Sequence, residues 1–199
     1  MTVIMGHKTA NKMYLGADNR LCTPDDELIC DNDNKIVVVN DKVAVAFAGY
    51  GGVKTIFENM IKENTKEIYV EDVIRIFKFI YWTLRIMKNN NASKNAFHYG
   101  ARFIIAGKSK KNKYCIYTMS ILNGKIEKPS MVNSFMFPPS DADTKECCEI
   151  YSKYTKADDS NFIQNTIKDI SKISKVISSS GDIWTCDITT GESSLKHFE

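Results

Sequence analysis

Four residues in the first quarter of the chain carry groups suited to acyl transfer: Thr2, Asp18, Lys35 and Gly49. A threonine hydroxyl is a weak nucleophile, but a free α-amino group on the same residue, with a reference pKa of about 7.7–8.0, can take its proton. A neighbouring Lys ammonium lowers the pKa of the hydroxyl, and a buried Asp keeps that Lys charged and oriented. A glycine amide at a strand end can bind a developing oxyanion. The set predicts attack by Thr2 on a carbonyl carbon, which requires removal of Met1.

Each of these residues also has an ordinary structural interpretation. Threonine occupies about one position in twenty by composition, so Thr2 alone carries no information. Asp18 can cap a turn, Lys35 can stand at the solvent-facing entrance of a strand, and Gly49 can simply end one. The catalytic interpretation therefore depends on the elements that position the four residues.

Extended and helical segments alternate along the chain in a definite order. Apolar runs predict strands over residues 2–8, 12–17, 35–39, 43–47, 101–106, 114–120, 130–135, 182–188 and 193–197. Helical spacing predicts helices over residues 53–62, 70–88, about 140–153 with Ser140 and Asp143 as a capping box, and about 160–178. Asp18 follows the second strand, Lys35 begins the third, and Gly49 follows the fourth.

The apolar character of these strands sets the architecture. Strands that are apolar on both sides cannot face water, so two sheets must pack face to face with helices covering their outer surfaces. The sequence predicts an α+β fold, a four-layer αββα sandwich with two mainly antiparallel sheets, formed by a single domain over residues 1–199. The polar residues 89–95 are expected to form a loop, and the basic residues 108–113 a solvated hairpin tip.

Composition excludes several classes of partner. The 27 basic and 24 acidic residues give a net charge of +3, too balanced for a nucleic acid or an anionic membrane to be the main partner. The most apolar stretch, residues 70–87, is interrupted by Arg75, Lys78 and Arg85. Its longest uncharged run is therefore well short of the roughly 20 residues that span a bilayer. The N-terminal residues lack the features of a secretion signal, so a soluble, cytoplasmic protein is expected. The six cysteines and three histidines lack metal-site spacing.

Two stretches resemble a known family. The start of the chain resembles the mature start of a proteasome β-type subunit. Residues 40–49, Asn-Asp-Lys-Val-Ala-Val-Ala-Phe-Ala-Gly, are similar to a stretch of the related bacterial two-component ATP-dependent protease. Both are N-terminal-nucleophile hydrolases, in which an N-terminal threonine, an Asp, a Lys and a Gly form the site. Asp18 lies at the family spacing from Thr2, and Lys35 and Gly49 keep the family separation, with one residue inserted between Asp18 and Lys35.

The resemblance also extends to the second half of the chain. Ser134, in Met-Val-Asn-Ser, stands where the family has a Gly-Ser-Gly turn that places a serine near the nucleophile, although Asn133 and Phe135 replace the glycines. Ile177 occupies the position of a second family aspartate, which the bacterial relative also lacks. The candidate catalytic residues are therefore Thr2, Asp18, Lys35, Gly49 and Ser134.

The resemblance implies a threonine endopeptidase without a metal or organic cofactor. It implies peptide or unfolded protein as substrate, a ring of identical subunits, and an ATP-driven unfoldase as a further partner. In the helix predicted over residues 70–88, apolar side chains occupy more of the helix surface than the single face needed to cover one sheet. Part of residues 79–82 is therefore expected to face outward as a contact surface. The alternatives are a non-catalytic structural subunit of such a ring and, less favoured, a small-molecule amidase.

Overall fold

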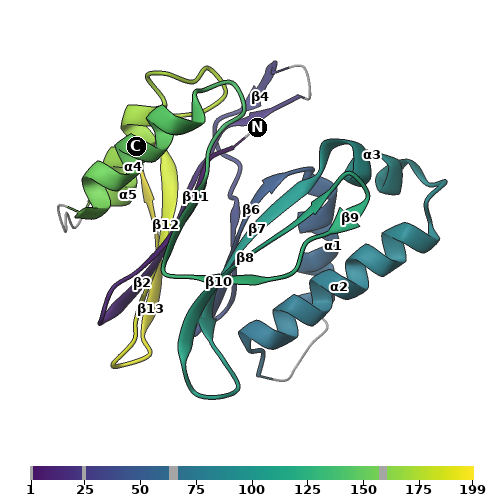
Figure 1. Ribbon diagram of the computed structural model, residues 1–199, viewed down its shortest axis with the longest axis horizontal. Helices are drawn as coiled ribbons and strands as arrows, with labels where there is room; N and C mark the ends of the chain where they lie inside the picture. Colours follow the sequence, from purple (N-terminus) through teal and green to yellow (C-terminus); the bar gives the residue numbers. More distant parts are fainter. Residues whose placement is uncertain (1, 24–25, 63–66, 157–160) are drawn as a thin grey trace.

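The computed structural model describes the chain except residues 1, 24–25, 63–66 and 157–160, and it contains two large antiparallel sheets (Figure 1). The first sheet has the order β11-β1-β2-β12-β13. Its strands are β1 (Ile4–Lys8), β2 (Lys12–Asp18), β11 (Ser134–Phe137), β12 (Gly181–Asp187) and β13 (Ser193–Phe198). The first two strands of the chain therefore lie at the centre of this sheet, beside strands from the C-terminal part.

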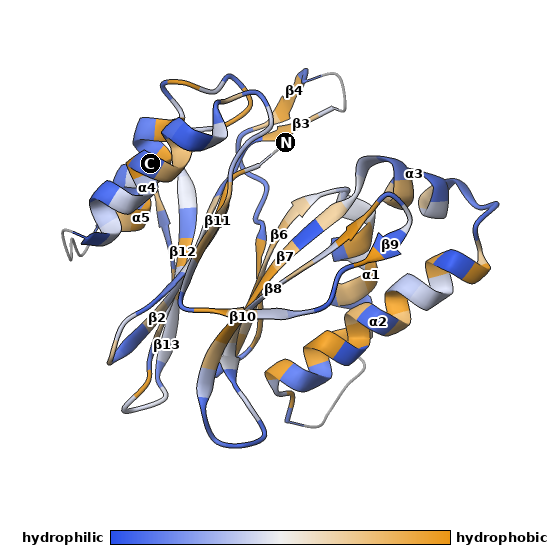
Figure 2. Cartoon of the chain, in the orientation of Figure 1, coloured by the Kyte–Doolittle hydropathy of each residue, from blue (hydrophilic) through white to orange (hydrophobic). Residues whose placement is uncertain are grey.

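The second sheet has the order β10-β8-β7-β6-β5, with β9 paired to β8. Its strands are β5 (Ile36–Asn40), β6 (Val43–Gly49), β7 (Ala101–Lys108), β8 (Tyr114–Leu122), β9 (Lys125–Ile126) and β10 (Ser130–Val132). A small separate hairpin pairs β3 (Leu21–Cys22) with β4 (Leu28–Cys30). In Figure 2 the strands of the second sheet are largely hydrophobic, whereas the turn between β7 and β8 is hydrophilic.

Helices cover the outer face of each sheet. The helices α1 (Gly51–Lys62), α2 (Val70–Ile86) and α3 (Asn91–Tyr99) pack on the second sheet, and α4 (Thr144–Lys156) and α5 (Phe162–Ile170) pack on the first (Figure 1). This arrangement confirms the predicted α+β class and the αββα order of layers. Within the described ranges, no helix combines the length and apolarity needed to cross a membrane.

Successive side chains along each strand point to opposite faces of its sheet, and together they form three hydrophobic cores. Leu15 on β2 points between the sheets, where it joins Ile4, Ile104 and Trp184 in the central core. The neighbouring Gly16 faces the opposite way, toward α5. Because successive strand residues point to opposite faces, each central strand contributes to both an inner and an outer core, as its apolar sequence requires.

The segment expected to be a loop over residues 89–95 contains the start of a helix. α3 begins at Asn91, and the Asn90 side chain accepts a hydrogen bond from the Ala92 amide at 2.8 Å. Asparagine is common both in turns and at helix N-caps, and the local sequence does not distinguish the two. The structure therefore has three helices between β6 and β7 within the described residues, where two were predicted.

The single strand predicted over residues 130–135 is two strands in different sheets. β10 pairs with β8 and β11 pairs with β1, and the chain crosses between the sheets at Asn133. The Asn133 carbonyl accepts a hydrogen bond from the Lys8 amide at 2.7 Å. The sequence on both sides of the crossing is strand-like, so its position depends on pairing with distant strands.

The two C-terminal helices are shorter than predicted. α4 begins at Thr144, and Asp143, rather than Ser140, caps it by accepting a hydrogen bond from the Glu146 amide at 2.9 Å. The expected start of the last helix near residue 160 lies outside the described residues. α5 ends at Ile170, followed by turn hydrogen bonds such as that from the Lys172 amide to the Asp169 carbonyl at 3.2 Å.

The packing of β2 against α5 leads to a stability prediction. A Cβ atom added at Gly16 would lie 2.3 Å from Ile163 Cγ2 on α5, so Gly16→Ala forces the sheet and helix apart. We expect a loss of about 1–3 kcal/mol in the free energy of unfolding, measured by urea denaturation. Gly51→Ala is the matched control, because nothing lies within 4 Å of a Cβ at Gly51. Equal stabilities of the two variants would contradict this account of the packing.

Candidate active site

A buried ion pair joins two of the predicted site residues. Lys35 Nζ lies 3.0 Å from Asp18 Oδ2, with side-chain exposures of 4% and 0%. Asp18 is the last residue of β2, and Lys35 directly precedes β5, so the pair connects the two sheets. Lys35 Nζ also donates a hydrogen bond to the Arg20 carbonyl. The pair confirms the predicted contact of Asp18 with Lys35 and fixes the direction of the ammonium group.

Asp18 also binds the backbone next to Thr2. Its Oδ1 accepts a hydrogen bond from the Val3 amide at 3.0 Å, and the Asp18 amide in turn donates to the Val3 carbonyl at 3.3 Å. Its Oδ2 accepts from the Arg20 amide at 2.9 Å. One carboxylate therefore holds the residue after Thr2, the start of the β2–β3 turn and the Lys35 ammonium group.

Burial and hydrogen bonding act in opposite directions on this carboxyl. Burial raises the pKa of Asp18 above its ordinary value, and the Lys35 ammonium with the Arg20 and Val3 amides lowers it part of the way back. An isolated buried carboxylate is costly, so Lys35 is needed for Asp18 to remain charged at its position. Asp18 is equally needed for Lys35 to remain charged, because no other acidic side chain among the described residues lies within salt-bridge distance of the Lys35 ammonium group.

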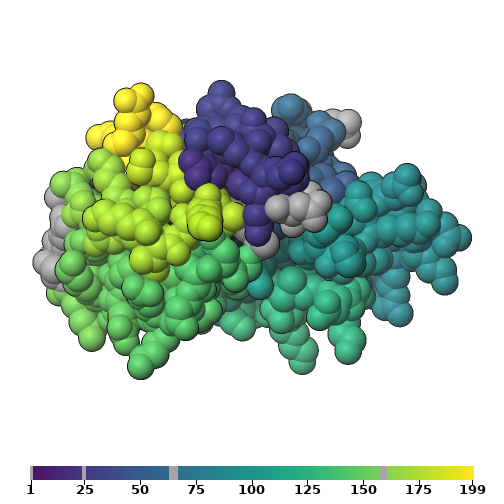
Figure 3. All heavy atoms as spheres, turned by 90° about the horizontal axis from the view of Figure 1, so that it is seen from above, coloured from purple at the N-terminus to yellow at the C-terminus, as the bar shows by residue number. Residues whose placement is uncertain are grey.

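Thr2, Lys35 and Gly49 line one small cavity of about 60 Å³. The other lining residues come from β3, the segment before β5, and the junction of β6 with α1: Leu21, Cys22, Asp33, Phe47, Ala48, Tyr50, Gly51 and Lys54. Figure 3 views the molecule from above, and the purple N-terminal part of the chain lies there between the yellow-green C-terminal part and the teal helical region. The fold therefore brings together the residues that the sequence predicted from their spacing.

Gly49 has a backbone conformation that other residues rarely adopt. Its φ is +95°, and an added Cβ would lie 2.5 Å from the Gly100 carbonyl oxygen. The same carbonyl accepts a hydrogen bond from the Tyr50 amide at 2.8 Å. Glycine is thus required here so that β6 can end against β7 and the chain can turn at once into α1.

The structure does not bring Ser134 to this cavity. Ser134 pairs with His7 in the β1–β11 ladder, toward the opposite end of β1 from Thr2. Its hydroxyl contacts His7 Nδ1 at 3.1 Å and the Tyr151 hydroxyl at 2.8 Å. Tyr151, whose burial raises its pKa to about 12, donates to the Gly6 carbonyl at 2.8 Å, which indicates a structural network.

The register of β11 explains the displacement of Ser134. Phe137 pairs with Ile4, the first residue of β1, so Ser134 lies three residues away from the end of the ladder that is nearer to Thr2. The sequence predicted one strand over residues 130–135 and no crossing between sheets, so it did not reveal this register. Ser134 is therefore corrected from a site residue to a residue of the β1–α4 contact.

Ile177 is buried at 2% exposure in the core beneath α4 and α5. The residues that follow it support the turn after β2. The Asn19 amide donates to Ser178 Oγ at 3.2 Å and to the Ser180 carbonyl at 3.3 Å. The segment at the position of the second family aspartate thus contributes to the site through Asn19, which is next to Asp18, and not through a carboxylate of its own.

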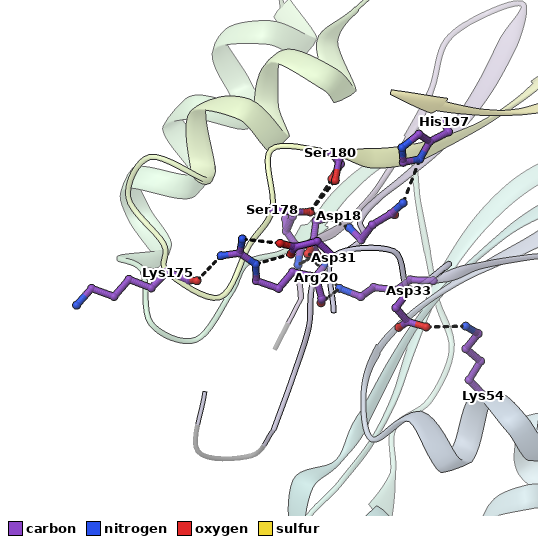
Figure 4. Close-up of polar contacts among 12 residues, drawn as sticks. Asp18, Arg20, Asp31, Asp33, Lys54, Lys175, Ser178, Ser180 and His197 are labelled. Atoms are coloured by element: carbon purple, nitrogen blue, oxygen red, sulfur yellow. Dashed lines mark hydrogen bonds and ion pairs between the residues drawn. The ribbon is translucent and has the colours of Figure 1, made fainter. Parts of the chain in front are cut away.

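Further polar contacts around the cavity were not found from the sequence (Figure 4). Arg20 makes a bidentate contact with Asp31, at 2.6 Å and 3.0 Å, and its Nη1 donates to the Lys175 carbonyl at 2.8 Å. Lys54 on α1 contacts Asp33 Oδ1 at 3.4 Å. These residues lie in irregular segments or pair over long separations, so no periodicity or motif marks them.

Metal-ligating side chains do not gather at this cavity. In the part of the chain that the structure describes, no group of three His, Cys, Asp or Glu residues is arranged to hold a metal ion. The polar side chains that line the cavity include the Thr2 hydroxyl, the Lys35 and Lys54 ammonium groups, the Asp33 carboxylate and the Cys22 thiol. A hydroxyl beside an ammonium group, with glycine backbone at the same cavity, suits nucleophilic attack and oxyanion binding.

Comparison with known proteins gives one family. A family model described as a proteasome subunit matches residues 2–132, about two thirds of the chain. The matched region begins at Thr2 and includes Asp18, Lys35 and Gly49, whereas Ser134 lies beyond it. No curated protein sequence matches the chain significantly.

The burial of the Asp18–Lys35 pair leads to a second prediction. Asp18→Asn leaves the Lys35 ammonium buried without a counter-charge, so we expect the free energy of unfolding to fall by about 3–5 kcal/mol. Asp31→Asn removes one partner of the solvent-exposed Arg20–Asp31 pair and should cost less than about 1 kcal/mol. Urea denaturation of both variants at pH 7 measures the difference. Similar losses for the two variants would show that the buried pair contributes no more to the free energy of unfolding than the exposed pair does.

Proposed function

Because this chain belongs to the proteasome subunit family, we propose that it is a threonine endopeptidase that cleaves peptide bonds through the Thr2 hydroxyl once Met1 is removed. The observation that carries the proposal is the buried Asp18–Lys35 pair, whose Lys35 lines the same cavity as Thr2 and Gly49. A structural threonine would need no buried ammonium group beside it.

The proposed reaction assigns one step to each residue. The Thr2 hydroxyl oxygen attacks the peptide carbonyl carbon while the Thr2 α-amine takes the hydroxyl proton. The Lys35 ammonium stabilises the deprotonated oxygen, and Asp18 positions Lys35. The Gly49 amide binds the oxyanion. The C–N bond breaks as the α-ammonium returns its proton to the leaving amine, and water then hydrolyses the ester on Thr2.

A non-catalytic ring subunit is the second candidate function. It is favoured by the contacts of Asp18 with Val3 and Arg20, which stabilise the fold whether or not Thr2 reacts. The two candidates differ in what they require of Met1, because a retained methionine removes the α-amine that serves as base. The intact mass of the protein from its native host therefore distinguishes them.

The catalytic proposal predicts the behaviour of Thr2 variants. Protein lacking Met1 should hydrolyse short fluorogenic peptides, and Thr2→Ala should reduce kcat by about 10³-fold or more while the ion pair and the melting temperature are unchanged. Thr2→Ser, which keeps hydroxyl and amine, should retain part of the activity. Lys35→Ala should also abolish turnover, with circular dichroism used to confirm folding.

Thr55→Ala, at an exposed threonine on α1, is the matched control and should leave turnover within about twofold of wild type. Turnover that survives Thr2→Ala would rule out Thr2 as the nucleophile. Absence of turnover by correctly processed, assembled protein over a broad peptide library would favour the structural subunit.

Membership of the family implies a ring-like assembly. We propose that the ring consists of identical subunits, receives unfolded protein from an ATP-driven unfoldase, and works in the cytoplasm. Phe79 and Trp82 on α2 are 61% and 55% exposed, and Ile86 is 81% exposed, which agrees with the outward apolar surface expected from the sequence. Exposed aromatic surface of this kind is typical of subunit contacts.

The assembly proposal is tested by native mass spectrometry at micromolar concentration. We expect a closed oligomer, and Phe79→Glu with Trp82→Glu should convert it to monomers, because burying two carboxylates in an apolar contact is unfavourable. Lys145→Glu, at an exposed position on α4, is the control and should leave the oligomer intact. A dominant monomer at every concentration would contradict the proposal.

A further inference from the structure

A second and larger cavity, of about 800 Å³, lies at the end of the sandwich opposite Thr2. It is bordered by the end of β1, the β5–β6 turn, the β7–β8 turn and the β12–β13 turn. Figure 1 shows the turns after β7 and β12 at the end of the molecule away from the N-terminus. β6 runs from this cavity to Gly49, and its seven residues span about 20 Å, so the two cavities are separate.

Four lysines line this cavity: Lys8, Lys42, Lys108 and Lys113. No aspartate or glutamate of the described chain lines it. The lining of the cavity therefore carries four positive charges and no negative one, although the whole protein has a net charge of only +3. The basic hairpin tip predicted from the sequence is thus one wall of a concave basic site.

The lysines have donor capacity left for a ligand. Lys8 Nζ donates to the Tyr114 carbonyl at 2.6 Å, which fixes its position and leaves two of its three N–H groups. Lys42 pairs with the half-exposed Glu67 at 3.1 Å. The ammonium groups of Lys108 and Lys113 have no hydrogen bond or ion pair within the described residues.

The nearest carboxylate of the β12–β13 turn is occupied. Asp187 Oδ1 accepts hydrogen bonds from the Thr189 amide at 2.8 Å, the Thr189 hydroxyl at 2.5 Å and the Thr190 amide at 3.2 Å. These bonds lower the pKa of Asp187 and hold the carboxylate within its own turn. The remaining lining supplies further donors, from Asn112 and Asn133, and an apolar wall that includes Met131 and Ile188.

We propose that this cavity binds a small, multiply phosphorylated anion, with nucleoside triphosphates and inorganic polyphosphate as its two sources. Lysine ammonium groups bind phosphate as point charges, and several of them are needed to balance three or more negative charges. The volume lies within the range of about 300–1,000 Å³ usual for small-molecule sites. The apolar wall offers a surface for a base.

Titration calorimetry at 0.15 M salt with inorganic tripolyphosphate and with ATP tests the proposal. We expect a Kd below about 1 mM for wild-type protein, and a loss of affinity of about tenfold or more for Lys108→Gln with Lys113→Gln. Lys94→Gln with Lys125→Gln removes the same charge from exposed positions on α3 and β9, and should change affinity less than about twofold. Asn133→Asp, which adds a negative charge to the lining, should weaken binding without removing a lysine.

Each outcome bears on the proposal. Tighter binding of ATP than of tripolyphosphate supports the nucleoside as source, and equal binding supports polyphosphate. Equal weakening by the two double variants would indicate general charge attraction and overturn the site, as would a Kd above about 10 mM for both ligands. Tighter, variant-sensitive binding of a single-stranded oligonucleotide would overturn the assignment to a small ligand. No residue of this site lines the Thr2 cavity, so the result is independent of peptidase activity.

Discussion

The ion pair between Asp18 and Lys35 is the interaction on which the geometry of the Thr2 cavity depends. Both side chains are removed from water, so neither charge is stable unless the other is present at hydrogen-bond distance. The carboxylate also binds the Val3 and Arg20 amides, which are fixed to the same point. A charge pair that costs desolvation energy is therefore used to set the relative positions of β1, β2 and β5. The nucleophile proposed at residue 2 would need that rigidity, since a chain terminus otherwise frays.

The fold could be predicted because the apolar character of its strands, which sets the order of layers, can be read from short stretches of sequence. Continuous apolar strands require burial on both faces, and that alone leads to four layers. Asp18, Lys35 and Gly49 could be placed relative to one another because each lies at or next to the end of a strand that the sequence marks clearly, whereas their catalytic roles and that of Thr2 stay predictions. Ser134 was misplaced because its position depends on the register of β11 against β1 and on the crossing at Asn133, which are pairings between residues more than a hundred positions apart. α3 was missed because asparagine favours turns and N-caps alike.

The support around the pair could not be read from the sequence for a related reason. Arg20 reaches Asp31 and the Lys175 carbonyl, and the Asn19 amide reaches Ser178 and the Ser180 carbonyl. Each of these contacts joins the β2–β3 turn to a loop whose conformation is set by packing elsewhere. An exposed ion pair such as Arg20–Asp31 contributes little stability by itself. Their effect is positional, because they hold the turn whose backbone carbonyl and amide complete the surroundings of Lys35 and Asp18.

The backbone at Gly49 limits how the cavity could be altered. A side chain there would meet the Gly100 carbonyl at 2.5 Å, and no rotamer relieves a clash of the first side-chain carbon with a neighbouring strand. That wall is consequently closed to redesign. Leu21 and Cys22, which line the same cavity, are partly exposed and belong to a two-stranded hairpin outside both large sheets, and Cys22 also packs against the core beneath α4 and α5. Leu21 packs against none of the three cores of the described chain, so it is the hairpin position where a different side chain changes the shape of the cavity without disturbing the packing of the sheets.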